Sequence, residues 1–397
     1  MLALAHVSTD RRRASSAEGV SGDGADSTCP VPPCIRRLVG DSVYDEPVTS
    51  LPVLPPRRQR GNRKGHGRVT LADVAERVGV SAITVSRALR KPLMVSPETR
   101  DRIERAVAEL GYIPNRIAGS LASSSPSAVA AILPSLDNSI FTDVLKGAVG
   151  TLESSGYQVV LGNSHFDPRV EATLVETFLA HGVGAIMLTG ARHATRARSL
   201  LARSGIPVVQ TWSLPRRPIG ACVGFSNYDA SYAMVRHLIE RGYRDIAFVS
   251  AAVANNDRAA ARRRGYAKAL VDHGLFDDPR TTLESTFDLA AGAAALDRIR
   301  SVRPSTDAVF FANDVLASGA VLAALRLGLR VPADIAIAGF DDVELAGHLM
   351  PPLTTVRIDR IGLGATAAEL MLDALAGESI AGRRVDIGFE VIARATT

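Results

Sequence analysis

Residues 70–92 read TLADVAERVGVSAITVSRALRKP and decide the fold of the N-terminal part of this chain. Thr70 is an N-cap residue type with Asp73 three positions later, which predicts the start of a helix with one apolar face. Gly79 supplies the backbone freedom for a tight turn, and Ser81 then caps a second helix of about eight residues. The stretch predicts a helix-turn-helix, whose second helix enters the major groove of DNA.

Basic residues gather around this motif. Residues 57–125 hold fourteen Lys and Arg against six acidic residues, whereas residues 1–56 carry a net charge of −2 and residues 126–397 of −1. Clustered positive charge of this kind is typical of phosphate binding. A third helix is expected to begin at Ser96-Pro97 and to end at Gly111.

The second helix is expected to turn Val85 and Leu89 inward. Its other side chains, with the N-cap of the first helix, are then the candidates for DNA contact: Thr70, Ala82, Ile83, Thr84, Ser86, Arg87 and Arg90. Ala82 and Ile83 are apolar, which favours contact with thymine methyl groups, and Arg87 is the best candidate for a direct base contact.

The segments VAERVGVS, TVSRALR and ELGYIPNRIAGSLAS, followed by a long α/β part, resemble the LacI-type family of bacterial transcription regulators. The resemblance implies that residues 114–125, too short and too rich in Gly and Ser for a stable helix alone, form a hinge that becomes helical on operator DNA. Asn115 belongs to this hinge, Ala118 stands at its close-contact position, and Leu121 at the position that wedges between base pairs in the minor groove. Alternatively, Leu121 packs the linker onto the headpiece.

From residue 128 onward, apolar runs suited to buried parallel strands alternate with helical stretches, and the alternation restarts after residue 225. This pattern predicts an α/β class with two doubly wound parallel sheets. The resemblance implies a two-lobed, periplasmic-binding-protein-like core behind an all-α headpiece. The expected parts are an N-terminal extension (1–67), a headpiece (68–113), a hinge (114–125) and the core (126–397), with a first lobe at roughly 126–224 plus 356–380 and a second at roughly 225–355 plus 381–397. The segment VDIGFEVIAR is expected to form one final strand.

Residues 1–67 are rich in Ser, Gly, Asp, Pro and Arg and are expected to be disordered. They are either a real tail or the product of a wrongly assigned start.

A small-molecule effector is expected in the loops that follow the strands. The family's ligand positions fall on Asn138, Phe141, Trp212, Arg262, Asn313 and Asp341. Several stretches, among them AILPSLDNSIFTDVLKG and LRLGLRVPADIAIAGFDD, are most similar to the gluconate-type branch. That branch implies a sugar-acid effector whose carboxylate pairs with Arg262. His193 and Arg196 either help to attract the anion or lie in a solvated loop.

Other classes of protein are excluded or left as alternatives. No apolar run reaches the length of a membrane helix, no signal peptide is expected, and three cysteines do not make a disulfide framework or a zinc site. Catalytic motifs, cofactor sites and metal sites are not found. We therefore expect a cytoplasmic, nucleoid-associated homodimer that binds double-stranded operator DNA and no membrane. A regulator that uses a co-repressor such as a purine remains open, and a sugar-binding sensor without a DNA role is disfavoured.

Overall fold

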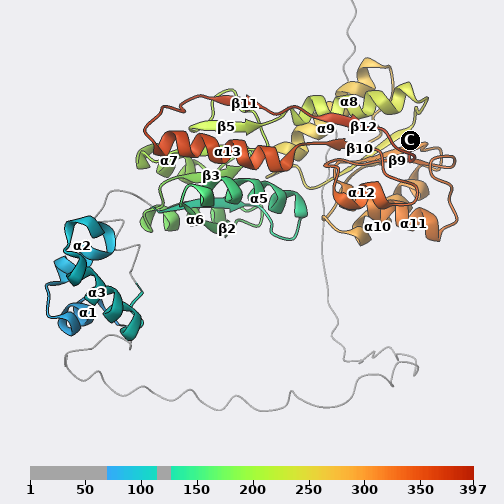
Figure 1. Ribbon diagram of the computed structural model, residues 1–397. Coiled ribbons are helices and arrows are strands. Elements are labelled where there is room, and N and C mark those ends of the chain that lie inside the picture. The colour runs from blue at the N-terminus through green and yellow to red at the C-terminus, as the bar shows by residue number, and fades with distance from the viewer. Residues whose placement is uncertain (1–68, 114–126) are drawn as a thin grey trace, which may run out of the picture. The chain divides into compact units, whose positions relative to one another are not determined.

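The computed structural model describes residues 69–113 and 127–397 of the chain (Figure 1). The first of these parts is helical. Its elements are α1 (Leu71–Val78), α2 (Ala82–Arg90), the short 3-10 helix η1 (Pro92–Met94) and α3 (Pro97–Leu110). The helix-turn-helix fold that the sequence predicts is confirmed.

The ends of the headpiece helices follow from local hydrogen bonds. The Thr70 side chain accepts from the Asp73 N–H while the Asp73 carboxylate accepts from the Thr70 N–H, so both halves of the capping box are present. Ser81 caps α2 through the Thr84 N–H at 3.1 Å. Ser96 is the N-cap residue of α3, but its hydroxyl donates to the Thr99 hydroxyl and makes no side-chain cap of the helix.

The first lobe of the core is built on a six-stranded parallel sheet with the order β11-β5-β4-β3-β1-β2. Its strands are β1 (Ala128–Leu133), β2 (Gln158–Asn163), β3 (Ile186–Thr189), β4 (Val208–Thr211), β5 (Ala221–Gly224) and β11 (Arg384–Asp386). Helices cover both faces: α6 (Pro168–Ala180) with α7 (Thr195–Ser204), and α5 (Ser139–Ser154) with α13 (Arg360–Leu375). Alternate residues of β1 supply the two apolar cores, as a strand buried on both faces must.

The second lobe holds a four-stranded parallel sheet with the order β7-β6-β8-β9. Its strands are β6 (Ile246–Ser250), β7 (Thr282–Glu284), β8 (Ala308–Phe311) and β9 (Ala336–Ala338). The helices pack in pairs, α8 (Asn227–Glu240) with α9 (Asp257–Asp272) and α10 (Leu289–Val302) with α11 (Asp314–Arg326), and α12 (Glu344–His348) lies beside α11. An antiparallel pair, β10 (Thr355–Arg357) and β12 (Glu390–Ile392), completes this lobe.

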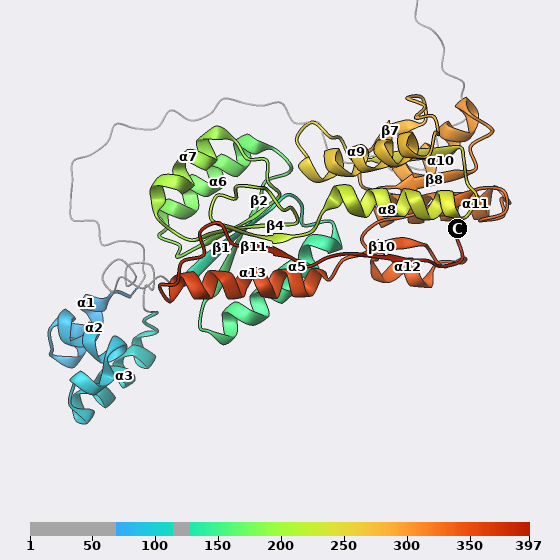
Figure 2. The same cartoon turned by 90° about the horizontal axis from the view of Figure 1, so that it is seen from above.

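The chain passes between the lobes three times, after β5, after β10 and after β11. The late elements α13 and β11, red in Figure 1, therefore lie among the green elements of the first lobe, and Figure 2 shows α13 running beside α5. The contact between α5 and α13 is close because each helix offers a glycine there. A Cβ on Gly147 would overlap the carbonyl of Ile361, and one on Gly364 would overlap that of Val144.

Three expectations about the C-terminal region differ from the structure. Residues 385–394 do not form one strand, since the chain turns at Gly388, where φ is +70°, and β11 and β12 belong to different sheets. The second lobe was also expected to resume at residue 381, yet β11 pairs with β5 and keeps residues 384–386 in the first lobe. The return at residue 356 likewise comes too early, because β10 pairs with β12 and α13 begins at residue 360.

Candidate functional site

Helix α2, the second helix of the helix-turn-helix and its recognition helix, carries both exposed and buried side chains. Ile83 is 66 % exposed and Arg87 is exposed, whereas Val85 is fully buried. Ala88 is also buried, and Leu89 packs only partly against the headpiece core. The remaining candidates on this helix differ in exposure, with half-buried side chains at Ala82, Thr84 and Ser86.

Other DNA-binding candidates can be placed only in part. Thr70 is exposed at the N-terminus of α1. The Thr84 hydroxyl lies 2.8 Å from the Ser81 hydroxyl and so belongs to the cap of α2. The side chain of Arg90 and the hinge residues Asn115, Ala118 and Leu121 lie outside what the structure describes, as does the extension 1–67.

A chamber between the lobes brings together five of the six predicted effector residues. We call it the effector chamber, and its lining is Asn138, Ile140, Phe141, Phe166, Trp212, Ala251, Asn256, Arg258, Ala259, Arg262, Phe287, Ala312 and Asn313. Asn138 caps α5 and Asn313 caps α11, so each amide is held at a helix start by its oxygen. The walls are mainly apolar and aromatic, with a few polar groups, as is typical of small-molecule sites.

Asp341, the sixth predicted residue, lies behind the chamber wall and is fully buried. Its Oδ2 accepts from the Asn313 amide at 2.8 Å, and its Oδ1 is 3.5 Å from the Arg262 guanidinium. Burial raises the pKa of the Asp341 carboxyl, and the neighbouring Arg262 opposes that rise. Its φ of +109° is a strained value for aspartate, of the kind that collects at functional sites.

Arg262 is largely occupied by the protein itself. Its Nε donates to Asn227 Oδ1 at 2.8 Å, its Nη1 donates to the Ala312 carbonyl at 2.7 Å, and its guanidinium lies 3.5 Å above the Phe340 ring. Desolvation lowers the pKa of Arg262 to about 10. This arginine therefore holds the chamber wall, and little of its guanidinium remains for the ligand carboxylate that the sequence assigned to it.

Arg258, which the sequence reasoning missed, is the less committed cation. It lines the effector chamber, is buried, and has Asp257 Oδ1 at 3.3 Å as its ion-pair partner among the described residues. Burial lowers the pKa of Arg258, opposed first by Asp257. Arg258 and Arg262 are four residues apart and share a face of α9, so helical spacing alone was a signal for both.

Three buried polar atoms around the chamber have no hydrogen-bond partner among the described residues. They are Asn138 Nδ2, Trp212 Nε1 and Asp341 Oδ1. A buried polar group without a partner costs about 1–3 kcal/mol, so a cluster of them at a chamber is a candidate ligand site.

Aromatic rings from both lobes close the chamber. Trp212 is 1 % exposed, has a φ of +72° and meets the Phe141 ring edge-on with centroids 5.7 Å apart. Phe166 of the first lobe stacks on Phe287 of the second at 6.0 Å. The sequence reasoning missed Phe166 and Phe287, although each stands in the loop that follows a strand, β2 and β7 respectively.

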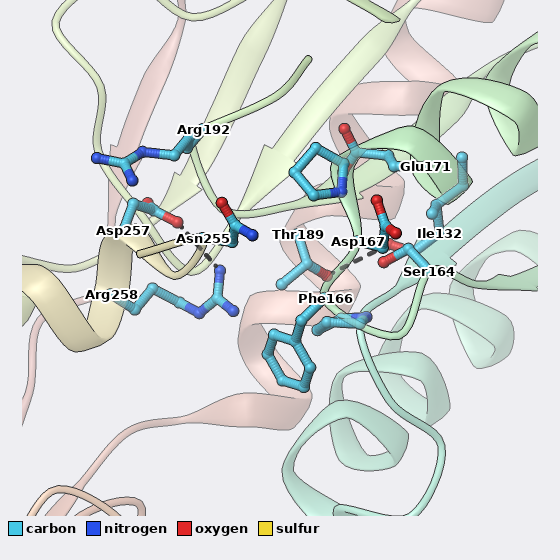
Figure 3. A pocket seen from close by; sticks show the side chains of 12 residues that line it. Ile132, Ser164, Phe166, Asp167, Glu171, Thr189, Arg192, Asn255, Asp257 and Arg258 are labelled. Carbon is cyan, nitrogen blue, oxygen red and sulfur yellow. Dashed lines mark hydrogen bonds and ion pairs between the residues drawn. The ribbon is translucent and has the colours of Figure 1, made fainter. Parts of the chain in front are cut away.

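A second, more polar chamber adjoins the first and shares Phe166 and Arg258 with it (Figure 3). Its polar side chains include Asp167, Glu171, Arg192, Asn255 and Asp257.

Neither expectation for His193 and Arg196 fits fully. His193 is buried, with Nδ1 2.9 Å from Glu171 Oε1, so it lies neither in the lining nor in a solvated loop. Arg196 pairs with Glu176 at the surface. Within the described ranges, no cluster of three or more His, Cys, Asp or Glu side chains could hold a metal ion, and no helix is long and apolar enough to cross a membrane.

Comparisons with known proteins agree with this architecture. Residues 70–115 match the family described as bacterial regulatory proteins, lacI family, and residues 235–397 match a periplasmic binding protein-like domain. The HTH-type transcriptional regulator GntR of Pseudomonas aeruginosa is 37% identical over 337 residues, which cover 85% of this chain and 98% of that protein.

Solved structures of similar proteins extend over the same range. A LacI-family regulator from Silicibacter pomeroyi has a TM-score of 0.77 at 34% identity and covers 83% of this chain and 99% of its own. The lac repressor dimer bound to operator and the anti-inducer ONPF has a TM-score of 0.71 at 28% identity. The match covers 83% of this chain and 99% of that one.

Proposed function

Because the chain belongs to the LacI family of DNA-binding transcription regulators, which are not enzymes, we propose that it represses genes of sugar-acid catabolism and leaves its operator when a gluconate-like ligand binds. The likeness to the GntR regulator supports the choice of sugar acids. The family binds operator DNA and small effectors, and the proposed working form is a homodimer in the cytoplasm, bound to the nucleoid.

The observation that carries the effector proposal is the set of unpartnered polar atoms at the effector chamber. Asn138 Nδ2 and Trp212 Nε1 are donors in residues that line the chamber, whereas Asp341 Oδ1 lies behind the wall and faces Arg262 at 3.5 Å. The hydroxyl oxygens of a polyhydroxy ligand accept from both donors, while its C–H faces pack on aromatic rings. Arg258 adds a buried cation with one carboxylate partner, which suits a carboxylate on the ligand.

On DNA, we propose that two headpieces of a dimer occupy successive major grooves. Ala82 and Ile83 contact thymine methyl groups there, and Arg87 makes a direct base contact. The two hinges enter the central minor groove, with Leu121 as the wedge, Ala118 at the close-contact position and Asn115 as a further DNA-binding residue of the hinge. Ligand binding between the lobes changes the spacing of the hinges and releases the operator.

The test is fluorescence anisotropy of the full chain on labelled DNA from its own upstream region, with D-gluconate or D-glucose added. Release by D-gluconate at micromolar to millimolar concentration, with a weaker response to D-glucose, is the expected result. Tight and salt-dependent binding that D-gluconate leaves unchanged would keep the repressor and reject this effector. Equal release by both ligands would reject the role of the carboxylate.

A second candidate effector is a planar heterocycle that acts as a co-repressor, such as a purine. It is favoured by the stacked Phe166 and Phe287 rings, one from each lobe, because a flat base stacks well on such surfaces. The same assay with guanine separates the two candidates, since a co-repressor tightens DNA binding whereas an inducer weakens it.

A further inference from the structure

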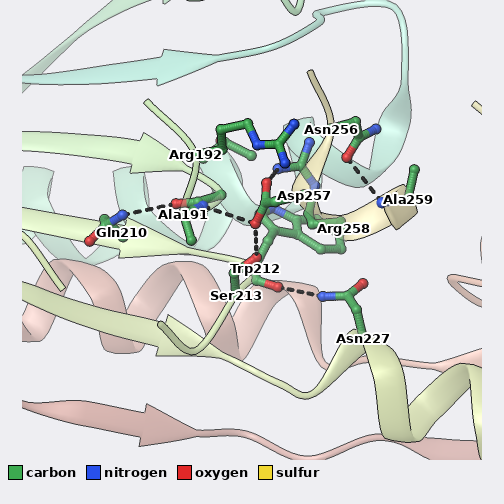
Figure 4. A network of polar contacts seen from close by, with 12 residues as sticks. Ala191, Arg192, Gln210, Trp212, Ser213, Asn227, Asn256, Asp257, Arg258 and Ala259 are labelled. Atoms are coloured by element: carbon green, nitrogen blue, oxygen red, sulfur yellow. Dashed lines mark hydrogen bonds and ion pairs between the residues drawn. The ribbon is translucent and has the colours of Figure 1, made fainter. Parts of the chain in front are cut away.

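Asp257, at the start of α9 in the second lobe, bonds to two loops of the first lobe (Figure 4). Its Oδ2 accepts from the Ala191 N–H at 3.0 Å and from the Ser213 hydroxyl at 2.7 Å. Ala191 follows β3 and Ser213 follows β4, so one carboxylate oxygen joins the lobes at two points. We call Asp257, Ala191 and Ser213 the interlobe clasp.

The approach of the lobes at the clasp leaves no space for a side chain at position 190. A Cβ added to Gly190 would lie 2.6 Å from Asp257 Oδ1 and 2.5 Å from Arg258 Nη1, and φ there is +88°. The clasp therefore depends on a glycine that allows both the close approach and the left-handed backbone.

The loop that carries Ala191 is fixed from within the first lobe. Gln210 Oε1 accepts from the Ile219 N–H at 2.8 Å, which turns its amide nitrogen toward the Gly190 carbonyl and His193 Nε2. With a donor facing Nε2, His193 accepts there and donates from Nδ1 to Glu171. The loop that carries the Ala191 N–H is thus held by buried contacts that lie within the first lobe.

The other oxygen of Asp257 faces Arg258, and this links the clasp to the effector chamber. Arg258 lies 3.3 Å from Asp257 Oδ1 and lines both chambers (Figures 3 and 4). Asp257 already accepts two interlobe hydrogen bonds, so it compensates the buried guanidinium only in part. Burying a charge without full compensation opposes closure of the lobes.

We propose that Asp257 holds the lobes closed through the clasp and that an anion on Arg258 makes this closure more favourable. When the lobes close, Asp257 forms the clasp and Arg258 loses water, and a ligand carboxylate on Arg258 supplies the missing counter-charge. Neutral ligands leave that cost in place. Asp257 is a positioning residue, and its role does not depend on the identity of the effector. Arg258 sets specificity for anionic ligands, and this role rests on the proposed sugar-acid effector.

The chain contains its own reporter for this test. Trp212 is its single tryptophan, is buried at the effector chamber and precedes the clasp residue Ser213. Quenching of its fluorescence by acrylamide measures how far the chamber is open, in the full-length protein and without any ligand.

The first measurement compares ligand-free wild type with Ser213→Ala and Asp257→Ala. Loss of clasp hydrogen bonds should open the chamber and raise the quenching constant at least two-fold in both variants, with thermal unfolding as the check on folding. Ser213→Ala removes one hydroxyl and remains informative if Asp257→Ala fails to fold. Quenching equal to wild type in a folded Ser213→Ala protein would overturn the clasp, whatever the effector is.

The second measurement titrates D-gluconate and D-glucose into wild type, Arg258→Met, Arg258→Lys and the control Arg264→Ala, an exposed arginine on the same helix. Arg258→Met should lose roughly ten-fold or more of the preference for D-gluconate, Arg258→Lys should recover part of it, and Arg264→Ala should keep it. If Arg258→Met kept the full preference for D-gluconate over D-glucose, the proposed role of an anion on Arg258 would be overturned. Failure of wild type to bind D-gluconate would reject the proposed effector and this half of the inference, while the quenching result would still decide the clasp.

Discussion

Asp314 is a fully buried carboxyl group one residue beyond the chamber wall. It accepts from the Val343 N–H at 2.9 Å and from the Thr355 hydroxyl at 2.6 Å. Burial, followed by the charge of Asp341, raises the pKa of Asp314 from 3.8 to about 7. The folded protein therefore holds this proton over a range of pH in which the unfolded chain has released it.

We predict that this group makes the free energy of unfolding fall as pH rises from about 4 to about 7 and contributes no further change above that. The stabilising effect of Asp314 is fully present at a pH below its pKa in the unfolded chain. It is lost once the pH reaches its pKa in the folded protein, because the unfolded state binds fewer protons between these two values. Asp314→Asn should remove this part of the fall in urea unfolding at pH 5, 6, 7 and 8. The exposed Asp297→Asn is the control, and a profile for Asp314→Asn that matches it would contradict the assignment.

Single residues also mark the limit of what the sequence could predict of the site. The positions Asn138, Phe141, Trp212, Arg262 and Asn313 were predicted by resemblance, and all five line one chamber. The sequence could not predict that Arg262 is occupied by the protein while Arg258 is less so. The groups that accept from Arg262, Asn227 Oδ1 and the Ala312 carbonyl, come from distant parts of the chain. Their roles in ligand binding stay predictions.

Close helix packing controls the stability of the first lobe at the scale of elements. Gly364 of α13 lies against the backbone of α5, whereas a Cβ on Gly150 of α5 would meet no described atom within 4 Å. We predict that Gly364→Ala lowers the free energy of unfolding by about 3 kcal/mol or more, since the helices must move apart. Gly150→Ala, the matched control, should raise it by roughly 0.5–1 kcal/mol. Urea unfolding measures both, and equal effects would contradict the packing argument.

The recognition helix gives a second prediction at this scale. Arg87 is exposed on α2, and we expect Arg87→Ala to relax sequence preference by about 1–3 kcal/mol at one base pair. Arg90→Ala, at the last position of this helix, should instead weaken binding to all sequences alike by loss of phosphate contact. Anisotropy on a set of single-substitution operators separates these outcomes, and a uniform loss from both variants would reject the Arg87 assignment.

The elements that the sequence predicts are those with a strong apolar pattern. The apolar runs of β1, β6 and β8 are continuous and buried, so periodicity alone reveals them. The three-residue strand β7 was missed because it is only half-buried and carries no comparable apolar run. The division of the last strand was missed because a single Gly388 turns the chain, and sequence pattern does not tell which sheet each half joins.

The whole molecule couples two binding events, and this coupling must be reciprocal. If D-gluconate weakens operator binding by a given factor, typically 5–150-fold, saturating operator must weaken D-gluconate binding by the same factor. We expect anisotropy of operator with and without ligand, and calorimetry of ligand with and without operator, to return equal factors. An unrelated duplex serves as the control, and a factor near one in both directions would contradict allosteric release.

The return of α13 and β11 to the first lobe has a consequence for how the protein is made. During translation β5 is complete at residue 224, but its neighbour β11 follows about 160 residues later, roughly 10–30 s at ordinary rates of synthesis. Until then β5 is an open sheet edge and the groove beside α5 lacks its helix, which are surfaces that favour aggregation of a nascent chain. The first lobe to be synthesised is thus completed after most of the second, so the two lobes mature together.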